Sequence, residues 1–201
     1  MSYKITKQSF LDDVSNHELI VIRNEGNYRH IRLKKPNSGC MHFDIVTWDG
    51  HLAYTGDMGC YVFSRVTDMF EFFRDDRENW GVNLGYWAEK LEAVDKTSGY
   101  KEFSWDEFEV NVMEFIEDQF DKLTEGDNLK VAREWVAHEL SNVEGDEFGA
   151  VQFYRDFDED NEYGVSLQDF WEHSSNVPSN RYVWCCWAIV WAIREYDKYY
   201  A

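Results

Sequence analysis

An Asp-Gly dipeptide at residues 49–50 constrains the fold of this chain more than any other local feature. The segments on either side of it, 43–48 and 51–55, alternate apolar and polar side chains, as strands do when they bury one face of a sheet. Asp-Gly favours a two-residue turn of type I′, because both central residues of that turn have positive φ. The sequence therefore predicts a tight antiparallel hairpin in which Trp48 pairs with His51.

This register assigns every side chain of the hairpin to one of two faces. The predicted core face carries Phe43, Ile45, Thr47, Leu52 and Tyr54. The opposite face carries His42, Asp44, Val46, His51, Ala53 and Thr55. A further turn within residues 55–59 would return the chain through a strand at 60–64, with Tyr61 and Phe63 on the core side. An earlier hairpin is expected from the β-rich residues 19–23 and 28–33.

The hydrophobic period becomes that of helices from about residue 66. A first helix is predicted where four apolar residues share one face, namely Val66, Met69, Phe70 and Phe73. Residues 104–107 (SWDE) form a capping box with Phe103 and Phe108 placed for a hydrophobic staple, so a second helix should begin there. Its predicted inward face is Phe108, Val112, Phe115, Ile116 and Phe120. Other helices are predicted over 80–94, 129–140, 167–173 after a Ser166 cap, and 182–196.

Together these elements predict an α+β fold that forms a single domain over residues 1–201. An antiparallel sheet of three to five strands is expected from residues 1–66, packed on one face by acidic helices from residues 67–201. Hydrophobic residues make up 44% of the chain and aromatic residues 17%, which is enough to fill a substantial core.

The charges are divided very unequally along the chain. Residues 1–66 contain 8 Lys or Arg and 7 Asp or Glu, whereas residues 67–201 contain 12 and 32. The whole chain has a formal net charge of -19, which repels nucleic acids and anionic lipids. Direct binding of nucleic acid or membrane is therefore not expected, and a basic protein partner is favoured.

The capped helix carries a predicted row of carboxylates on its outward face. Its members, at i, i+7, i+11 and i+14, are Glu107, Glu114, Asp118 and Asp121. A rigid row of this kind can imitate a phosphate backbone, because it releases counterions when it enters a basic cleft, as DNA does. A second acidic segment supplies Asp156, Asp158 and Asp160. We predict that these seven residues bind a partner; the alternative is an ordinary solvated acidic surface.

The polar face of the predicted sheet offers a different candidate site. Side chains that would converge there are His42, Asp44, His51, Thr55, Cys60 and Ser64. An imidazole, a carboxylate and a thiol can bind a metal ion or activate a nucleophile, which makes His42, Asp44, His51 and Cys60 the alternative catalytic residues. Polar side chains are equally typical of a solvated sheet face, which is the alternative interpretation.

No metal ion or cofactor is expected from the sequence. The four cysteines form no CxxC pair, and no nucleotide-binding, dinucleotide-binding or hydrolase motif occurs. The acidic loop that begins at Asp156 resembles a calcium loop only superficially. It has Asn161 and Leu167 where that loop requires glycine and a bidentate glutamate.

The chain is expected to be cytoplasmic, in the host cell. Its first residues lack the apolar stretch of a secretory signal. The longest apolar run, 182–193, is 12 residues long, which is short of the roughly 20 residues that span a bilayer. A buried helix explains that run better than a membrane span does.

Several stretches resemble proteins encoded by phages and prophages that have no assigned function. The resembling stretches are HFDIVTWDGHLAYTGDMGCYVF at 42–63, DMFEFFR at 68–74, NLGYWAEKL at 83–91, FWEH at 170–173 and WCCW at 184–187. The resemblance transfers no catalytic residue. It implies a small accessory protein, and such proteins often counter host defence, in some cases as acidic DNA mimics.

The sequence therefore leads us to expect a phage-encoded, non-enzymatic inhibitor. Its acidic helices would occupy a basic nucleic-acid-binding surface of a host protein, such as a restriction or CRISPR component. Two alternatives stay open: a small phage enzyme that uses the polar sheet face, and a structural or assembly adaptor.

Overall fold

A computed structural model of the chain describes residues 4–75, 77–120, 126–157, 161, 163–170 and 173–201. The chain divides into two compact units. Unit 1 consists of Met1–Lys101 and Pro178–Ala201, and unit 2 consists of Glu102–Val177. Each unit has its own cluster of buried apolar residues. This division differs from the single core that we expected, because unit 2 is inserted into the chain of unit 1.

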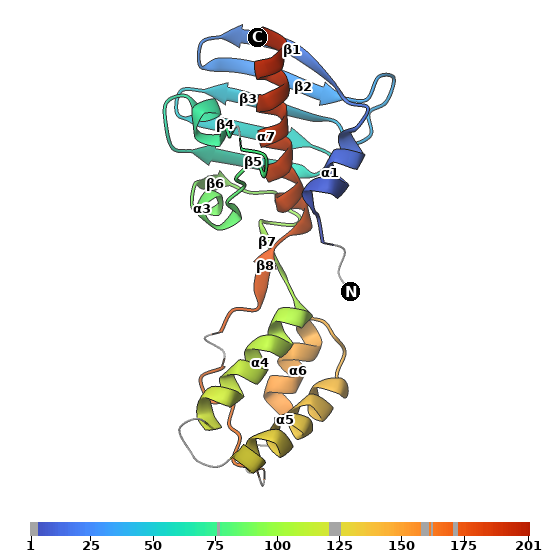
Figure 1. Ribbon diagram of the computed structural model, residues 1–201, viewed down its shortest axis with the longest axis vertical. Helices are drawn as coiled ribbons and strands as arrows, with labels where there is room; N and C mark the ends of the chain where they lie inside the picture. The colour runs from blue at the N-terminus through green and yellow to red at the C-terminus, as the bar shows by residue number, and fades with distance from the viewer. Residues whose placement is uncertain (1–3, 76, 121–125, 158–160, 162, 171–172) are drawn as a thin grey trace. The chain divides into compact units, whose positions relative to one another are not determined.

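Unit 1 is built on a six-stranded antiparallel sheet, which confirms the predicted α+β class (Figure 1). The strands follow one another in sequence order across the sheet. They are β1 (Glu18–Glu25), β2 (Tyr28–Lys34), β3 (Phe43–Trp48), β4 (His51–Gly56), β5 (Gly59–Ser64) and β6 (Leu91–Ala93). The sixth strand comes from the region 80–94 that was predicted to be helical.

The central hairpin has the predicted register, with Trp48 paired to His51. Its turn is not of type I′, because Gly50 has a positive φ of 79° whereas Asp49 is not among the residues with positive φ. The next turn is equally tight, since Gly56 pairs with Gly59. A Cβ at Gly56 would lie 2.3 Å from the carbonyl oxygen of His42, so this position requires glycine.

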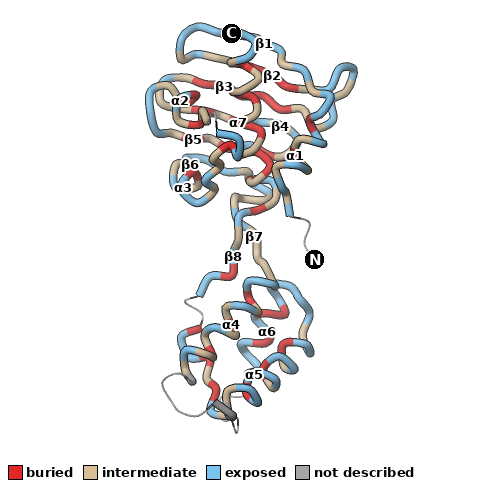
Figure 2. Tube along the Cα trace, viewed as in Figure 1, coloured by how far each residue is buried: buried red, intermediate tan, exposed pale blue. Residues whose placement is uncertain are grey.

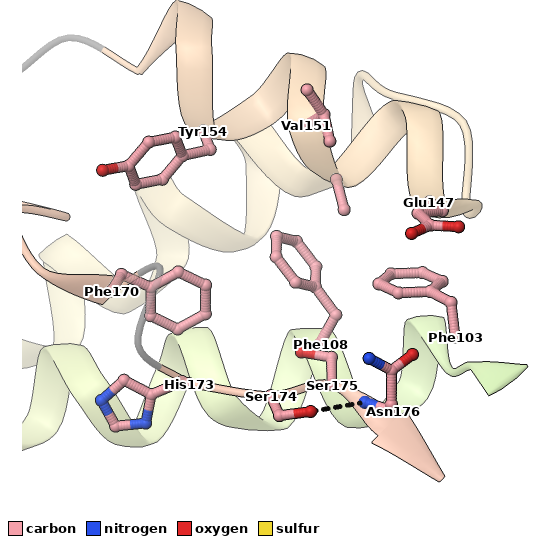
Figure 3. Close-up of a pocket in the computed structure, with 11 residues that line it drawn as sticks. Phe103, Phe108, Glu147, Val151, Tyr154, Phe170, His173, Ser174, Ser175 and Asn176 are labelled. Carbon is pink, nitrogen blue, oxygen red and sulfur yellow. Dashed lines mark hydrogen bonds between the residues drawn. The ribbon is translucent and has the colours of Figure 1, made fainter. Parts of the chain in front are cut away.

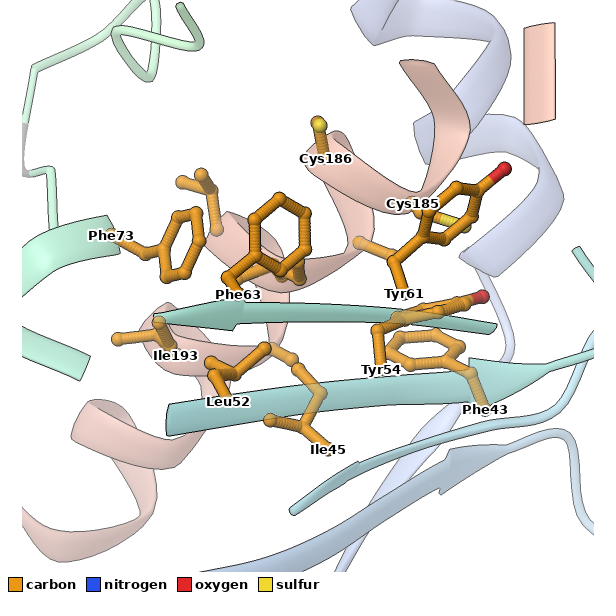
Figure 4. Packing of buried hydrophobic residues seen from close by; sticks show 14 of the residues in the cluster. Phe43, Ile45, Leu52, Tyr54, Tyr61, Phe63, Phe73, Cys185, Cys186 and Ile193 are labelled. Atoms are coloured by element: carbon orange, nitrogen blue, oxygen red, sulfur yellow. The ribbon is translucent and has the colours of Figure 1, made fainter. Parts of the chain in front are cut away.

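The helices of unit 1 cover the apolar face of the sheet. They are α1 (Lys7–Val14), α2 (Met69–Phe73), α3 (Leu84–Ala88) and α7 (Asn180–Tyr200). Figure 4 shows side chains of the strands, such as Phe43, Tyr54 and Phe63, meeting Cys185 and Ile193 of α7. Figure 2 shows how burial is concentrated along the central strands and α7.

The long helix α7 returns to the sheet although it lies at the end of the sequence. The side chain of Ser179 accepts a hydrogen bond from the Tyr182 amide and caps the helix. Trp184 is fully buried, packs its ring edge-on against Phe10, and donates its indole N–H to Asp13 Oδ2 at 2.9 Å. This helix therefore covers one face of the sheet, as was expected of the helices that follow residue 66.

Unit 2 is a small helical body. Its helices are α4 (Trp105–Phe120), α5 (Gly126–Ser141) and α6 (Glu147–Asp156). The short strands β7 (Lys101–Phe103) and β8 (Asn176–Pro178) pair with each other where the chain passes between the units. The predicted start of α4 is confirmed: Ser104 Oγ accepts a hydrogen bond from the Glu107 amide, and the rings of Phe103 and Phe108 lie 6.0 Å apart.

Most of the predicted inward face of α4 is buried. Phe108, Val112 and Ile116 contact the core of unit 2, and Phe115 packs partly against it. The side chain of Phe120 lies outside the described residues. The helices predicted over 129–140 and 182–196 are confirmed within longer ones, α5 and α7.

Two helix predictions are wrong. Only residues 84–88 of the region 80–94 are helical, because Trp80 and Gly81 both have positive φ ahead of them and β6 follows. Residues 167–170 form a turn instead of a helix, since Asp169 has a φ of 67°. Residues 171–172 of that second region lie outside the described residues.

No helix in the described part of the chain is both long enough and apolar enough to cross a membrane.

Candidate functional site

The acidic residues of the chain are concentrated in unit 2. Unit 2 has 22 Asp or Glu against 4 Lys or Arg, which is a net charge of −18. Unit 1 has 17 against 16, which is a net charge of −1. The structure therefore places the charge boundary at residues 101 and 178, whereas the sequence suggested residue 66.

Three members of the predicted carboxylate row lie on α4 as expected. Glu107, Glu114 and Asp118 are exposed, and helical geometry places them within about 40° of one another around the axis. The row spans about 16 Å at 1.5 Å per residue. Asp121, the fourth predicted member, lies outside the described residues.

The described cations of unit 2 are matched by nearby carboxylates. Each pairs with one acidic residue: Lys130 with Glu134 at 3.9 Å, Arg133 with Glu117 at 2.5 Å, and Arg155 with Asp156 at 2.7 Å. Among the described residues, no Lys, Arg or His forms an ion pair with the row Glu107, Glu114 and Asp118. This row therefore faces solvent without an ion-pair partner among the described residues.

The second acidic segment is only partly described. Asp156 ends α6, and its hydrogen bond from Arg155 lowers the pKa of the Asp156 carboxyl. The ion pair leaves Asp156 a weaker candidate for a basic partner than the row on α4. Asp158 and Asp160 lie outside the described residues.

The loop that follows is organised by the side chain of Asn161. Its side chain donates to the Val165 carbonyl at 2.7 Å and accepts from the amides of Tyr163 and Val165 at 3.1 Å each. Leu167 is fully buried in the core of unit 2.

An apolar groove opens on unit 2 between α4 and α6 (Figure 3). It has a volume of about 450 Å³. The rings of Phe103, Phe108 and Phe170 line one side, and Val151 and Tyr154 of α6 face them. The groove is completed by the segment at residues 173–176, in which the Asn176 amide donates to Ser174 Oγ at 3.4 Å.

Sequence reasoning missed this groove: Phe108 was expected to be an ordinary core residue, and Phe170 was given no role of its own. They are 5% and 3% exposed, yet their rings contribute to its wall. A signal was present on α6. Its apolar residues lie on both sides of the helix, so Ala150 and Phe153 are buried while Val151 and Tyr154 are exposed.

On the polar face of the unit 1 sheet, the candidate catalytic residues have separate partners. Asp44 is 7% exposed and accepts hydrogen bonds from Arg32 at 2.7 and 2.8 Å and from His30 at 2.7 Å. Burial would raise the pKa of Asp44, but the hydrogen bonds from Arg32 and His30 outweigh it and lower that pKa. Asp44 is therefore held as a carboxylate in an ion pair.

The other predicted members of this face do not join Asp44. His42 Nδ1 donates to the Gly39 carbonyl at 2.8 Å, and His51 Nδ1 donates to the Asp49 carbonyl at 2.9 Å. Cys60 is an exposed free thiol. Among the described residues, no three His, Cys, Asp or Glu side chains are grouped so that they could hold a metal ion.

Comparisons of the chain with protein-family models, with curated protein sequences and with solved structures found no match.

Proposed function

We propose that this protein is a non-enzymatic inhibitor that covers a basic nucleic-acid-binding surface of another protein with the acidic surface of unit 2. The segregation of charge carries the proposal. A net charge of −18 on unit 2 is far more than solubility requires, and unit 1 folds with a net charge of −1.

The physical basis is the exchange of counterions. Carboxylates such as Glu107 and Asp118, which form no ion pair within the described part of the chain, concentrate cations from solution around α4. When a cleft that binds phosphates contacts α4, its Lys and Arg side chains replace these cations and release them into solution, as they do on DNA. The acidic helix thereby competes for the same surface as the nucleic acid.

The resemblance to phage and prophage proteins supports a proposal about where the inhibitor comes from and which kind of protein it acts on. It favours a phage-encoded inhibitor that acts in the host cytoplasm on a defence protein that grips DNA or RNA. The geometry of the unit 1 sheet gives less support to an enzyme, because Asp44 is engaged by Arg32 and His30.

The test begins with capture of host nucleic-acid-binding proteins on the immobilised chain. Each captured protein is then bound to labelled DNA or RNA, and the full chain is titrated in. We expect displacement of the nucleic acid, with an apparent affinity that falls steeply as salt rises. A triple variant, Glu107→Gln, Glu114→Gln and Asp118→Asn, should displace less well and show a flatter salt dependence.

The matched control removes three exposed carboxylates from unit 1 instead, as Glu18→Gln, Glu78→Gln and Glu89→Gln. It changes the net charge of the chain by the same amount and should displace nearly as well as the wild type. Equal displacement by all three proteins would refute the role of α4. Binding of the captured protein without any loss of nucleic acid would refute inhibition by mimicry.

A further inference from the structure

The groove on unit 2 is lined in part by apolar side chains that are unusually exposed. Val151 is 60% exposed and Tyr154 is 40% exposed, and both line the groove opposite Phe108 (Figure 3). Phe148, on the same helix but outside the lining, is 71% exposed. Clustered apolar exposure of this kind on a soluble protein typically marks an interaction site.

The surroundings of the groove restrict what can occupy it. Glu147 lines it, and Glu144 and Asp146 lie exposed just before it in the chain. The whole unit carries a net charge of −18, so an anionic ligand such as a fatty acid would be repelled. A second copy of this chain that presented its own unit 2 would also be repelled.

The occupant must be attracted by the acidic rim and must fill an apolar interior. A basic protein segment does both, because its cations pair with the rim and one of its apolar side chains can enter the groove. We propose that the groove receives a single large apolar side chain, of the size of leucine or phenylalanine, from a basic segment of the partner protein. This inference rests on the proposed function and adds a specific anchor to it. A volume of about 450 Å³ is ample for one aromatic ring.

The anchor would do what the carboxylates cannot. Counterion release weakens rapidly as salt rises, whereas burial of an apolar side chain does not depend on released ions. The phosphate backbone of a competing nucleic acid offers the partner no such apolar groove. The groove would therefore let the protein keep its partner under salt conditions in which nucleic acid dissociates, and select that partner among basic proteins.

Two fluorescent peptides test the anchor. Both are arginine-rich; one has a central phenylalanine and the other has alanine at that position. We expect the wild-type chain to bind the phenylalanine peptide about tenfold more tightly, measured by fluorescence anisotropy. The difference should persist at raised salt, while both affinities fall.

Variants then locate the anchor on the protein. Val151→Ser with Tyr154→Ser should abolish the difference between the two peptides, and Phe148→Ser, a matched change on the same helix, should preserve it. All three positions are exposed, so a thermal melt should show folded variants. The two peptides are also compared on the wild-type chain, so this comparison still tests the anchor if the double variant fails to fold.

The contrary outcomes separate the two proposals. Equal, salt-dependent binding of both peptides by the wild type would overturn the groove inference and leave the role of the carboxylates standing. Absence of salt-dependent binding by either peptide would overturn both. A concentration-dependent dimer that is lost in the double variant would assign the groove to self-association and also overturn the inference.

Discussion

The side chain of Gln119 on α4 and the backbone of Ser166 form a reciprocal pair of hydrogen bonds. Gln119 Nε2 donates to the Ser166 carbonyl at 2.6 Å, and the Ser166 amide donates to Gln119 Oε1 at 3.1 Å. One amide side chain therefore satisfies both polar groups of a backbone unit that belongs to no helix or strand. This contact holds the segment before Leu167 against the helix that carries the acidic row.

Replacing Gln119 by Glu should loosen unit 2 selectively. The substitution keeps one acceptor but removes the N–H donor, so the Ser166 carbonyl would face a carboxylate. We expect a loss of about 1 to 2 kcal/mol in the free energy of unfolding of unit 2. Hydrogen exchange followed by mass spectrometry should show faster exchange in residues 161–170 and little change in the sheet. Gln168→Glu, on an exposed side chain, should leave exchange unchanged. Uniform effects in both units would contradict this assignment.

Excision of unit 2 should leave unit 1 folded. The Ser179 amide donates to the Tyr100 carbonyl at 3.0 Å, so the two ends of the inserted segment lie next to each other. A chain in which a short Gly-Ser linker replaces residues 102–177 closes only a small loop, at little entropic cost. We expect a cooperative thermal transition and near-neutral behaviour on ion exchange. A chain without such a transition would show that the sheet depends on unit 2.

How far the sequence could predict this fold depends on the range of the interactions. The register of Trp48 with His51 was predictable because a local turn and an alternating pattern determine it. The contact between Asp13 and Trp184 spans 171 residues, and no local pattern indicates it. The boundaries of unit 2 follow from such contacts. The distribution of charge along the chain does not reveal these contacts, and it suggested residue 66 instead of residue 101.

The candidate site shows the same limit. The capping box predicted where α4 begins, and the helical period then correctly placed Glu107 and Asp118 on the face toward solvent. The groove requires Phe108 and Phe170 to meet Val151 across different segments, which only tertiary packing determines. Ser166 Oγ accepts a hydrogen bond from the Gln168 amide at 3.0 Å, as the predicted cap requires, but the predicted helix does not continue because Asp169 adopts a positive φ.

Acid should weaken unit 1 through the pair of Arg29 and Asp68. Both guanidinium NH2 groups of Arg29 donate to Asp68, at 2.8 and 2.9 Å, and Asp68 also caps α2. Burial would raise the pKa of Asp68, but the hydrogen bonds from Arg29 and from the Phe70 amide outweigh it and lower that pKa below 3.8. A carboxyl with a lowered pKa in the folded state stabilises the fold above its unfolded pKa. This contribution is lost as the pH falls below about 4.

Denaturant unfolding across this pH range checks the pair. Asp68→Asn should lower stability at neutral pH by about 1 to 3 kcal/mol and flatten the loss of stability on acidification. Asp12→Asn removes an exposed carboxylate from α1 and should leave both quantities nearly as in the wild type. An Asp68→Asn variant with the full acid dependence of the wild type would assign that dependence to other carboxyl groups.

The four cysteines should separate into two reactive and two protected thiols. Cys40 and Cys60 are exposed, whereas Cys185 and Cys186 are fully buried on α7. Burial raises the pKa of both buried thiols, and only the thiolate reacts with alkylating reagents. Mass spectrometry after brief iodoacetamide treatment near pH 8 should therefore find two modified cysteines in the folded chain and four in denaturant. Because Cys185 and Cys186 are both buried in the core of unit 1, their labelling rate measures the opening of unit 1 alone. The Gln119→Glu variant, which is expected to loosen unit 2, should leave that rate unchanged. Rapid labelling of Cys185 or Cys186 in the native chain would show that α7 detaches from the sheet far more often than its buried contacts imply.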